Sequence, residues 1–462
     1  MKRQNRVAIY NISSKILLKG ISIFSAPIFA RLLSDAGYGI VSLYTVWVSI
    51  ASIAFCGQTQ GTLINAKIEY SEEEQSRYQS SVMGLSLVWF LVCGGLVLLF
   101  LGPVSALLKL DEWIVVMILI QALGTYCVNF LHCKYTNEFQ ARKNMLLSVG
   151  IALSTLIVSL VFVLLFPKEI NHYGRILGIG ATYGGAGLIT CLVILLRGRT
   201  FYHRQYWKFC LMLCLPMVFQ NLSDLILGQC DRLMLQHMMN EAMVGQYSLA
   251  YNFGGILFTI FGALNGTWVP FFFDDMKYGR EEALRAQAKN FLELFTVLSV
   301  GFVLLTKEVY YLFAGPTFRE GTMLVPIFAS SYFLNFLCTF PVNFEYFHKK
   351  TKPVAIITVS ASVLNLVLNY ILIRAIGVAG AALATAISHG IQLLMHHVYS
   401  SVFLGKGSYP FPVSFWGKYF AVYFLMVAAV YATDGMPLLR WSVGACIGLW
   451  ELWRIKKRGV LL

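Results

Sequence analysis

Runs of about 20 apolar residues recur along the whole chain, and they constrain its fold more than any other feature. A run of that length can cross the hydrocarbon core of a bilayer as a helix. The mean hydropathy of +0.67 and the 13% share of charged residues agree, because a soluble protein of this composition could not cover its surface with polar groups. We count fourteen runs, near residues 12–33, 38–60, 81–101, 113–133, 145–166, 174–196, 210–238, 243–268, 290–313, 322–345, 354–373, 377–404, 415–432 and 438–453. The sequence therefore predicts an all-α polytopic membrane protein with about fourteen transmembrane helices.

The distribution of basic residues predicts which ends of the spans face the cytoplasm. With the N-terminus inside, 25 of the 36 Lys and Arg fall in cytoplasmic segments, and seven, including Arg175 and Arg440, fall in outside segments. Such a bias places both termini in the cytoplasm. Because the basic residues lie in short clusters between apolar runs, the formal charge of +14 reports topology, and we expect no nucleic-acid partner. No cleavage pattern follows the N-terminal MKRQNR, so the first apolar segment is expected to remain.

An internal repeat is visible in the polar segments between spans. The segment from Tyr70 to Gln79 matches the segment from Tyr278 to Gln287 at an offset of 208 residues. A second match, at an offset of 203, pairs Gly174 and Thr182 with Gly377 and Thr385. In the first match the identical pairs are Tyr70/Tyr278, Glu73/Glu281, Glu74/Glu282, Arg77/Arg285 and Gln79/Gln287. Six spans separate the copies, so both keep the same orientation, which defines a parallel repeat.

The repeat predicts the domain organisation. An N-lobe of six spans covers residues 1–208, and a C-lobe of six spans covers 209–404. Residues 405–462 add two further spans and a basic cytoplasmic tail. The longest inside segments, near 61–80 and 269–289, have mixed charge and helix-forming residues, so we expect helices that lie along the cytoplasmic surface.

Several functions are excluded by what the segments between spans lack. No outside segment exceeds about a dozen residues, which leaves no room for an extracellular catalytic domain, and we expect no catalytic residues. The ten cysteines fall singly, without a CxxC pair, so we expect neither a metal nor a disulfide role for them. No phosphate-binding loop is present, and we expect no cofactor.

Short motifs, in order along the chain, resemble those of the polysaccharide flippase family. They are Ala30-Arg31-Leu32-Leu33 with Tyr38-Gly39, Leu215-Pro216, Asp231-Arg232-Leu233, Val244-Gly245-Gln246-Tyr247-Ser248, Asn365-Leu366-Val367-Leu368-Asn369 and Gly377-Val378-Ala379-Gly380-Ala381-Ala382. The family belongs to the multidrug/oligosaccharidyl-lipid/polysaccharide exporter (MOP) superfamily. The resemblance implies two six-helix lobes in a V-shaped, MATE-like arrangement, with two additional C-terminal helices.

The resemblance also implies a function. Such flippases move an undecaprenyl-diphosphate-linked oligosaccharide, for example an O-antigen unit, from the inner to the outer leaflet of the bacterial cytoplasmic membrane by alternating access. The product serves surface polysaccharide biosynthesis. The implied partners are the lipid-linked oligosaccharide, the bilayer, and polysaccharide polymerase and chain-length proteins.

Four residues are candidates for substrate binding in a wet cavity between the lobes. Lys15 and Lys19 lie on one face of the first predicted helix and could bind a diphosphate, although Lys15 could equally reach the cytoplasmic headgroups. Gln220 and Asp224 lie on one face of the seventh predicted helix. An ionised residue inside a membrane helix marks a functional site by default, but an interhelical hydrogen bond is the alternative.

Two charged pairs are candidates for an outer gate. Arg31 and Asp35 sit near the outer end of the first predicted helix, and Asp231 and Arg232 sit near the outer end of the seventh. Opposite charges from the two lobes could meet there while the cavity faces the cytoplasm. The alternative is headgroup anchoring with a local ion pair.

Two histidines are candidates for proton coupling. His389 and His396 share one side of the twelfth predicted helix, and histidine titrates near neutral pH. The alternative is that both are hydrogen-bonded packing residues.

Two other classes of function compete with a flippase. A MATE-like, ion-coupled small-molecule antiporter should have acidic cavity residues, whereas the predicted N-lobe spans hold basic residues and almost no acid apart from Asp35. A polysaccharide polymerase or ligase should carry a sizeable outer loop with catalytic Arg or His, which the spacing of the spans excludes.

Overall fold

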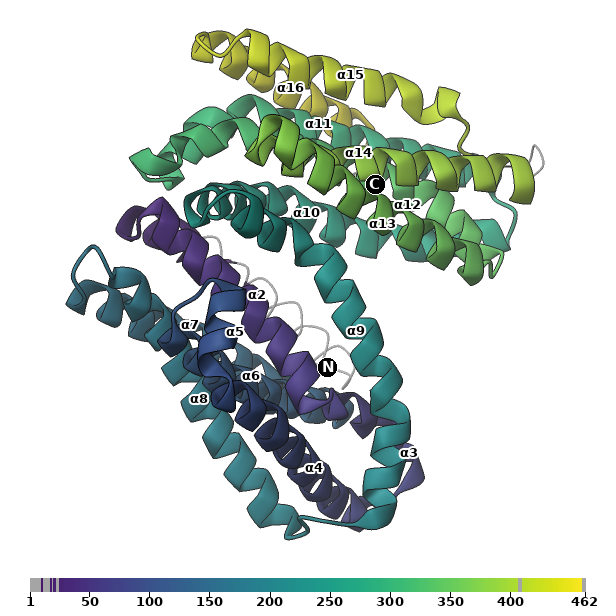
Figure 1. Cartoon of the computed structure of the whole chain (residues 1–462). Coiled ribbons are helices and arrows are strands. Elements are labelled where there is room, and N and C mark those ends of the chain that lie inside the picture. The colour runs from purple at the N-terminus through teal and green to yellow at the C-terminus, as the bar shows by residue number, and fades with distance from the viewer. Residues whose placement is uncertain (1–9, 11–16, 19, 22–24, 406–408, 459–462) are drawn as a thin grey trace. The chain divides into compact units, whose positions relative to one another are not determined.

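The computed structural model describes residues 10, 17–18, 20–21, 25–405 and 409–458, and in these ranges every regular element is helical (Figure 1). Eleven helices are long and apolar enough to cross a membrane. A twelfth span is α9 (Arg204–Met238), whose segments Arg204–Leu225 and Gly228–Met238 meet at 55°. The prediction of an all-α polytopic membrane protein is therefore confirmed. The first predicted span lies largely outside the described residues, and its described part, 25–32, is helical.

The chain divides into two compact units, Met1–Leu233 and Met234–Leu462, with the division inside α9. The lobe limits expected from the repeat, at 208/209 and 404/405, stay predictions. The first unit contains α2 (Asp35–Cys56), η1 (Thr59–Thr62), α3 (Leu63–Glu69), α4 (Glu72–Leu99), α5 (Leu101–Leu108), α6 (Glu112–Asn137), α7 (Ala141–Leu165) and α8 (Asn171–Gly198).

Helix α8 is the centre of the first unit, since it packs against α4, α6 and α7. Glycines allow these close approaches. A Cβ added to Gly124 of α6 would lie 2.3 Å from the backbone oxygen of Tyr183 in α8, and one added to Gly187 would lie 2.5 Å from the Cα of Gly124. Only glycine fits where two helix backbones come this close.

The second unit contains α10 (Glu241–Lys277), α11 (Glu281–Phe313), η2 (Pro316–Leu324), α12 (Val325–Phe347), α13 (Thr351–Ile376), α14 (Val378–Val398), η3 (Tyr399–Leu404), α15 (Val413–Ala432) and α16 (Pro437–Arg458). Helix α12 is its centre and packs against α10 and α14. A chain of aromatic rings fills the space between α10, α11 and α12. It includes Trp268, Phe291, Phe295, Phe336 and Phe340, all fully buried or nearly so.

The two copies of the repeat have the same local structure. Tyr70 caps the C-terminus of α3, and α4 begins two residues later. Tyr278 likewise caps the C-terminus of α10, and α11 begins three residues later. The matched sequence thus marks a helix junction once in each half, and its place on the cytoplasmic side stays a prediction.

The surface helices expected near 61–80 and 269–289 are found only in part. In the first segment, α3 (Leu63–Glu69) is a separate short helix, and its place along the membrane surface stays a prediction. The end of this segment belongs to α4, which starts at a capping box in which the Ser71 side chain and Glu74 exchange hydrogen bonds with each other's backbone. The second segment is shared between the end of α10 and the start of α11. There, polar, helix-forming residues extend the spanning helices beyond the apolar stretch instead of forming a separate element.

The fourteenth predicted span, 438–453, corresponds to helix α16, which is not among the apolar spans because three charged residues interrupt it. Arg440 pairs with Glu308 of α11, and its side chain is only 2% exposed. Arg454 pairs both with Glu293 of α11 and with Glu451 of its own helix, and all three side chains are at most 11% exposed. Ion pairs at both ends therefore fix α16 against α11.

Candidate functional site

Most buried polar side chains of the first unit are hydrogen-bonded to one another. Tyr44 of α2 donates to Gln121 of α6. The Thr59 hydroxyl lies 2.7 Å from that of Ser86 and 2.6 Å from that of Tyr126. Because these groups satisfy each other's hydrogen-bonding capacity, they are stable in an apolar surrounding. We therefore do not consider them candidates for binding a ligand.

Arg175 of α8 is one of the exceptions, and it carries a charge. Its guanidinium carbon lies 3.7 Å from the centre of the Phe29 ring. The residue is half-buried, but its Nη1 is buried and has no hydrogen-bond partner among the described residues, and none of their carboxylates lies within ion-pair distance. Tyr38 and Tyr183 are close enough to interact with it electrostatically. A buried guanidinium nitrogen with an unused donor is an expensive feature, and an anion would satisfy it.

The sequence did not identify Arg175, which the topology assigned to an outside segment. Helix α8 begins at Asn171, so Arg175 lies in its second turn and inside a candidate span. In a sequence, an arginine at the edge of an apolar run is typical of a residue that contacts lipid headgroups. Only the contacts of Arg175 in the structure distinguish it from such a residue.

Among the predicted substrate-binding residues, Lys15 and Lys19 lie outside the described residues. Gln220 and Asp224 are both exposed on α9, one helical turn apart. This arrangement agrees with the helical spacing read from the sequence, and their role in binding stays a prediction.

The predicted gate residues lie on three helical segments of the first unit, which are residues 25–32, α2 and α9. Arg31 is exposed, and Asp35 stands in the first turn of α2, where its carboxylate accepts from the Ala36 N–H. Asp231 is buried and accepts from the Arg232 N–H, while the Arg232 guanidinium donates to Gln229 at 2.6 Å. Each pair is thus held locally, and whether the two pairs meet stays a prediction.

The two predicted histidines have different surroundings, although both lie on α14. The Nδ1 of His389 lies 3.1 Å from the backbone oxygen of Ser331. His396 is fully buried, and its Nδ1 lies 3.0 Å from both carboxylate oxygens of Glu345, which is also fully buried. Sequence reasoning overlooked Glu345, the acid that ends the apolar run of α12.

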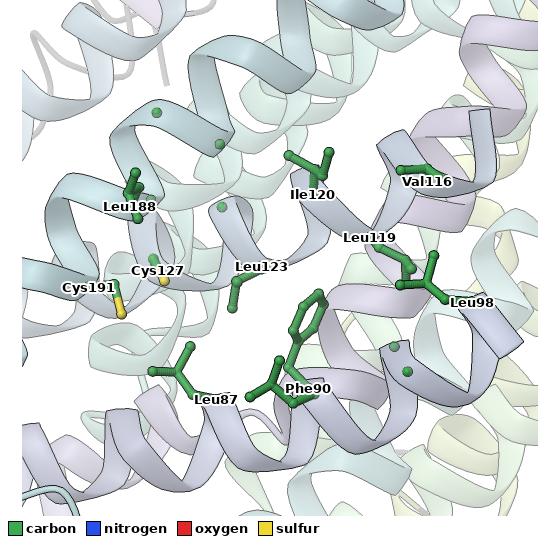
Figure 2. A pocket seen from close by; sticks show the side chains of 17 residues that line it. Leu87, Phe90, Leu98, Val116, Leu119, Ile120, Leu123, Cys127, Leu188 and Cys191 are labelled. Atoms are coloured by element: carbon green, nitrogen blue, oxygen red, sulfur yellow. The ribbon is translucent and has the colours of Figure 1, made fainter. Parts of the chain in front are cut away.

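An apolar groove of about 600 Å³ lies between α4, α6 and α8 (Figure 2). Leu87 and Phe90 of α4, Leu119 and Leu123 of α6, and Leu188 of α8 point into it. Its lining contains no charged side chain. The groove can therefore accommodate hydrocarbon, but not the polar head of a substrate.

Comparison with solved structures identifies the fold. The fold is similar to that of the lipid II flippase MurJ in an inward closed conformation, with a TM-score of 0.69 and 17% identity over 98% of this chain and 99% of the other. It is also similar to an inward-facing multidrug resistance MATE family transporter of the MOP superfamily, with a TM-score of 0.57 and 14% identity over 84% of this chain and 94% of the other. The protein thus has the fold that these two membrane proteins share.

The family follows from the sequence comparison. A family model described as polysaccharide biosynthesis protein matches residues 6–276, which is more than half of the chain, and the protein belongs to that family. An uncharacterized membrane protein of Haemophilus influenzae is 23% identical over 347 residues, covering 74% of this chain and 83% of the relative.

Proposed function

We propose that the protein is a flippase that moves an undecaprenyl-diphosphate-linked oligosaccharide from the inner to the outer leaflet of the bacterial cytoplasmic membrane by alternating access. Membership of the polysaccharide biosynthesis family and the fold shared with a lipid II flippase support this proposal. Both termini lie in the cytoplasm, and polymerase and chain-length proteins act on the product. The observation that carries the proposal is Arg175, a half-buried arginine whose Nη1 is buried and which has no acidic partner among the described residues.

Arginine suits this substrate for a physical reason. A guanidinium presents a planar fork of donors that matches two phosphate oxygens at once. Inside a membrane protein, a diphosphate needs such fixed donors to replace its water. In this proposal Arg175 is a phosphate-binding group of the first unit, and Lys15 and Lys19 are further cations on the path.

A MATE-like, ion-coupled antiporter of small molecules is the second candidate. The observation that favours it is the carboxylate of Asp224, exposed on a candidate membrane helix, where it could bind a cationic solute. The two candidates demand opposite charges at the binding site, so substitutions at Arg175 and Asp224 separate them. A membrane enzyme is disfavoured because the family and the fold are those of transporters.

The test is glycan export in a strain whose own copy of the gene is deleted and replaced by variants. Arg175→Gln should lower export by about 10- to 100-fold, the loss expected for one charged hydrogen bond, and Arg175→Lys should keep more activity. Arg374→Gln is the matched control, because Arg374 also lies over an aromatic ring, that of Tyr370 at 4.1 Å, but is exposed. Near-normal export by Arg175→Gln at equal protein level would remove the observation that supports a diphosphate substrate.

The same assay tests the cations and acids predicted from the sequence. Lys19→Ala should impair export without changing the amount of protein in the membrane, and Lys19→Arg should impair it less. If Asp224→Asn abolished resistance to cationic drugs while glycan export was normal, the antiporter function would replace the flippase.

The gate is tested by charge reversal. Arg232→Asp should block export, because it strands a desolvated charge that costs several kcal/mol, and Asp35→Arg in the same chain should partly restore it. A double variant no better than the worse single variant would show that the two sites are separate headgroup anchors.

A further inference from the structure

Three polar side chains meet at the predicted cytoplasmic end of the second unit, inside its core. Glu345 of α12 and His396 of α14 are each 0% exposed, and the imidazole Nδ1 lies 3.0 Å from both carboxylate oxygens. The hydroxyl of Ser400 in η3 lies 3.0 Å from the Glu345 Oε1 and 3.2 Å from the backbone oxygen of Pro341. The other ring nitrogen of His396, Nε2, is buried and has no hydrogen-bond partner among the described residues.

No arginine or lysine of the described residues neutralises this carboxylate, which distinguishes it from the other buried acids of the unit. Asp275 and Glu451 are paired with arginines, whose charge is permanent. The charge of the Glu345–His396 pair depends instead on how many protons the pair holds. With an ionised acid and a neutral imidazole the net charge is −1, and with one more proton, on either group, it is zero. Because a net charge in a buried site costs far more than a neutral pair, the closed cluster favours the additional proton.

We propose that Glu345, His396 and Ser400 form a proton-binding site that couples cytoplasmic pH to the opening of the α12–α14–η3 end of the second unit. Closing the cluster takes up one proton from the cytoplasm, and opening it to water releases that proton. The proposal concerns one unit and does not depend on the identity of the substrate. That this proton also drives transport, as predicted from the histidines, rests in addition on the proposed function.

The neighbouring groups leave the pair as the titrating centre. Cys338 of α12, His397 of α14 and Tyr409, which precedes α15, lie around it. Burial, followed by the influence of Cys338 and Glu345, raises the pKa of Tyr409 well above its ordinary value, so its phenol stays protonated at neutral pH. Helix α10 also contacts α14, and its Asp275 is already paired with Arg280 at 2.8 Å. Within the described residues no charged side chain of α13 or α15 bonds to the pair.

The backbone next to the cluster is suited to local opening. Residues Tyr399–Leu404 form a π-helix, in which the Gly405 N–H donates to the Ser400 oxygen at 2.8 Å. The wider π turn is a rare conformation that occurs mostly at functional sites. Gly405 fits closely there, since an added Cβ would lie 2.9 Å from the Ser400 oxygen. Ser400 therefore links the protonated pair directly to the least regular turn of the unit.

The sign of the pH effect follows from the proton count. In water at neutral pH a glutamate is ionised and a histidine is mostly neutral, so the open form holds one proton fewer than the closed form. Lower pH therefore favours the closed form. The closed-to-open ratio should change by up to tenfold per pH unit above about pH 6.5, and it should level off below, where an exposed histidine is itself protonated.

Hydrogen–deuterium exchange of the full chain in lipid nanodiscs tests the proposal without any transport substrate. Peptides that cover residues 396–405 would be followed at pH 6.5, 7.5 and 8.5, with correction for the intrinsic pH dependence of exchange. We expect opening of the natural protein to rise up to tenfold per pH unit. Glu345→Gln keeps a hydrogen-bonding group of similar shape and leaves only an imidazole, which is neutral in both forms above about pH 6.5. The double variant Glu345→Gln with His396→Asn leaves no titrating group, so both variants should remove this pH dependence.

Two further variants keep the outcome decisive. Ser400→Ala retains both titrating groups, so it should open more at every pH while its pH slope stays that of the natural protein. Glu308→Gln changes an acid that is paired with an arginine, so it should leave the pH slope of opening unchanged. A natural protein whose opening is independent of pH would overturn the proton site, and so would a slope that persists in Glu345→Gln or in the double variant. Either result would leave the flippase proposal untouched.

Discussion

Replacing Arg454 with methionine should sharply destabilise the second unit. The Arg454 side chain is 6% exposed, and its partners Glu293 and Glu451 are 11% and 5% exposed. Without the guanidinium, two carboxylates would face each other in a buried site. Removing one partner of a buried ion pair costs about 3–5 kcal/mol, which corresponds to roughly two to three and a half powers of ten in the folded-to-unfolded ratio.

The assay is denaturant unfolding of the purified chain in nanodiscs, with Lys457→Met as the control. Lys457 also lies on α16 and contacts an aromatic ring, Trp453 at 5.0 Å, but it is exposed, so its loss should cost less than about 0.5 kcal/mol. The combined change Glu293→Gln, Glu451→Gln and Arg454→Met should restore most of the stability, because it removes the stranded charges. If the triple variant is no more stable than Arg454→Met, the loss reflects packing of the arginine stem, and the electrostatic reasoning is refuted.

Three further predictions test the fold. Gly124→Ala should destabilise the first unit by about 1–3 kcal/mol in the same unfolding assay, since its Cβ would clash with α8, whereas Gly95→Ala, which meets no atom within 4 Å, should not. Ser71→Ala should remove the capping box and cost about 1 kcal/mol, measured likewise. Reporter enzymes fused after Arg204 should report the cytoplasm and those after Asn240 the outside; a cytoplasmic signal at Asn240 would contradict the parallel repeat.

The helices could be predicted from the sequence because the length of an apolar run is a local property. The runs near 38–60 and 113–133, for example, correspond to α2 and α6. The ends of the helices were harder to predict from the sequence, although one capping signal was present. Ser71 followed by Glu74 is a capping box, and it marks the start of α4 where we expected a continuous surface helix.

The surroundings of the charged residues could not be predicted, because they depend on partners far away in the chain. Arg440 and Arg175 were both assigned to outside segments from their position at the edge of an apolar run. In the structure, Arg440 is paired with an acid 132 residues earlier, whereas Arg175 has no acidic partner among the residues that the structure describes. Two residues of the same type and similar sequence context thus have opposite surroundings.

Glu345 illustrates the same limit at the proposed proton site. It lies 51 residues before His396, and in the sequence it is merely the acid that precedes a cluster of lysines. His396 attracted attention through helical spacing with His389, yet its contacts are with a different helix. Helical spacing identifies which side of a helix a residue occupies, but not what lies opposite.

The ion pairs between α11 and α16 have a consequence for how the protein is made. Glu308 leaves the ribosome 132 residues before Arg440 does, and at about 5–20 residues per second this interval lasts roughly 7 to 26 seconds. During that time α11 must stay at the membrane with its acids unmatched, either protonated or sheltered by the helices that follow it. Helix α16 in turn carries charged side chains, among them Arg440, Glu451 and Arg454, and is poorly suited to enter the bilayer alone. Each helix is thus a condition for the other's insertion, and biogenesis of the second unit should be complete only when α16 has been translated.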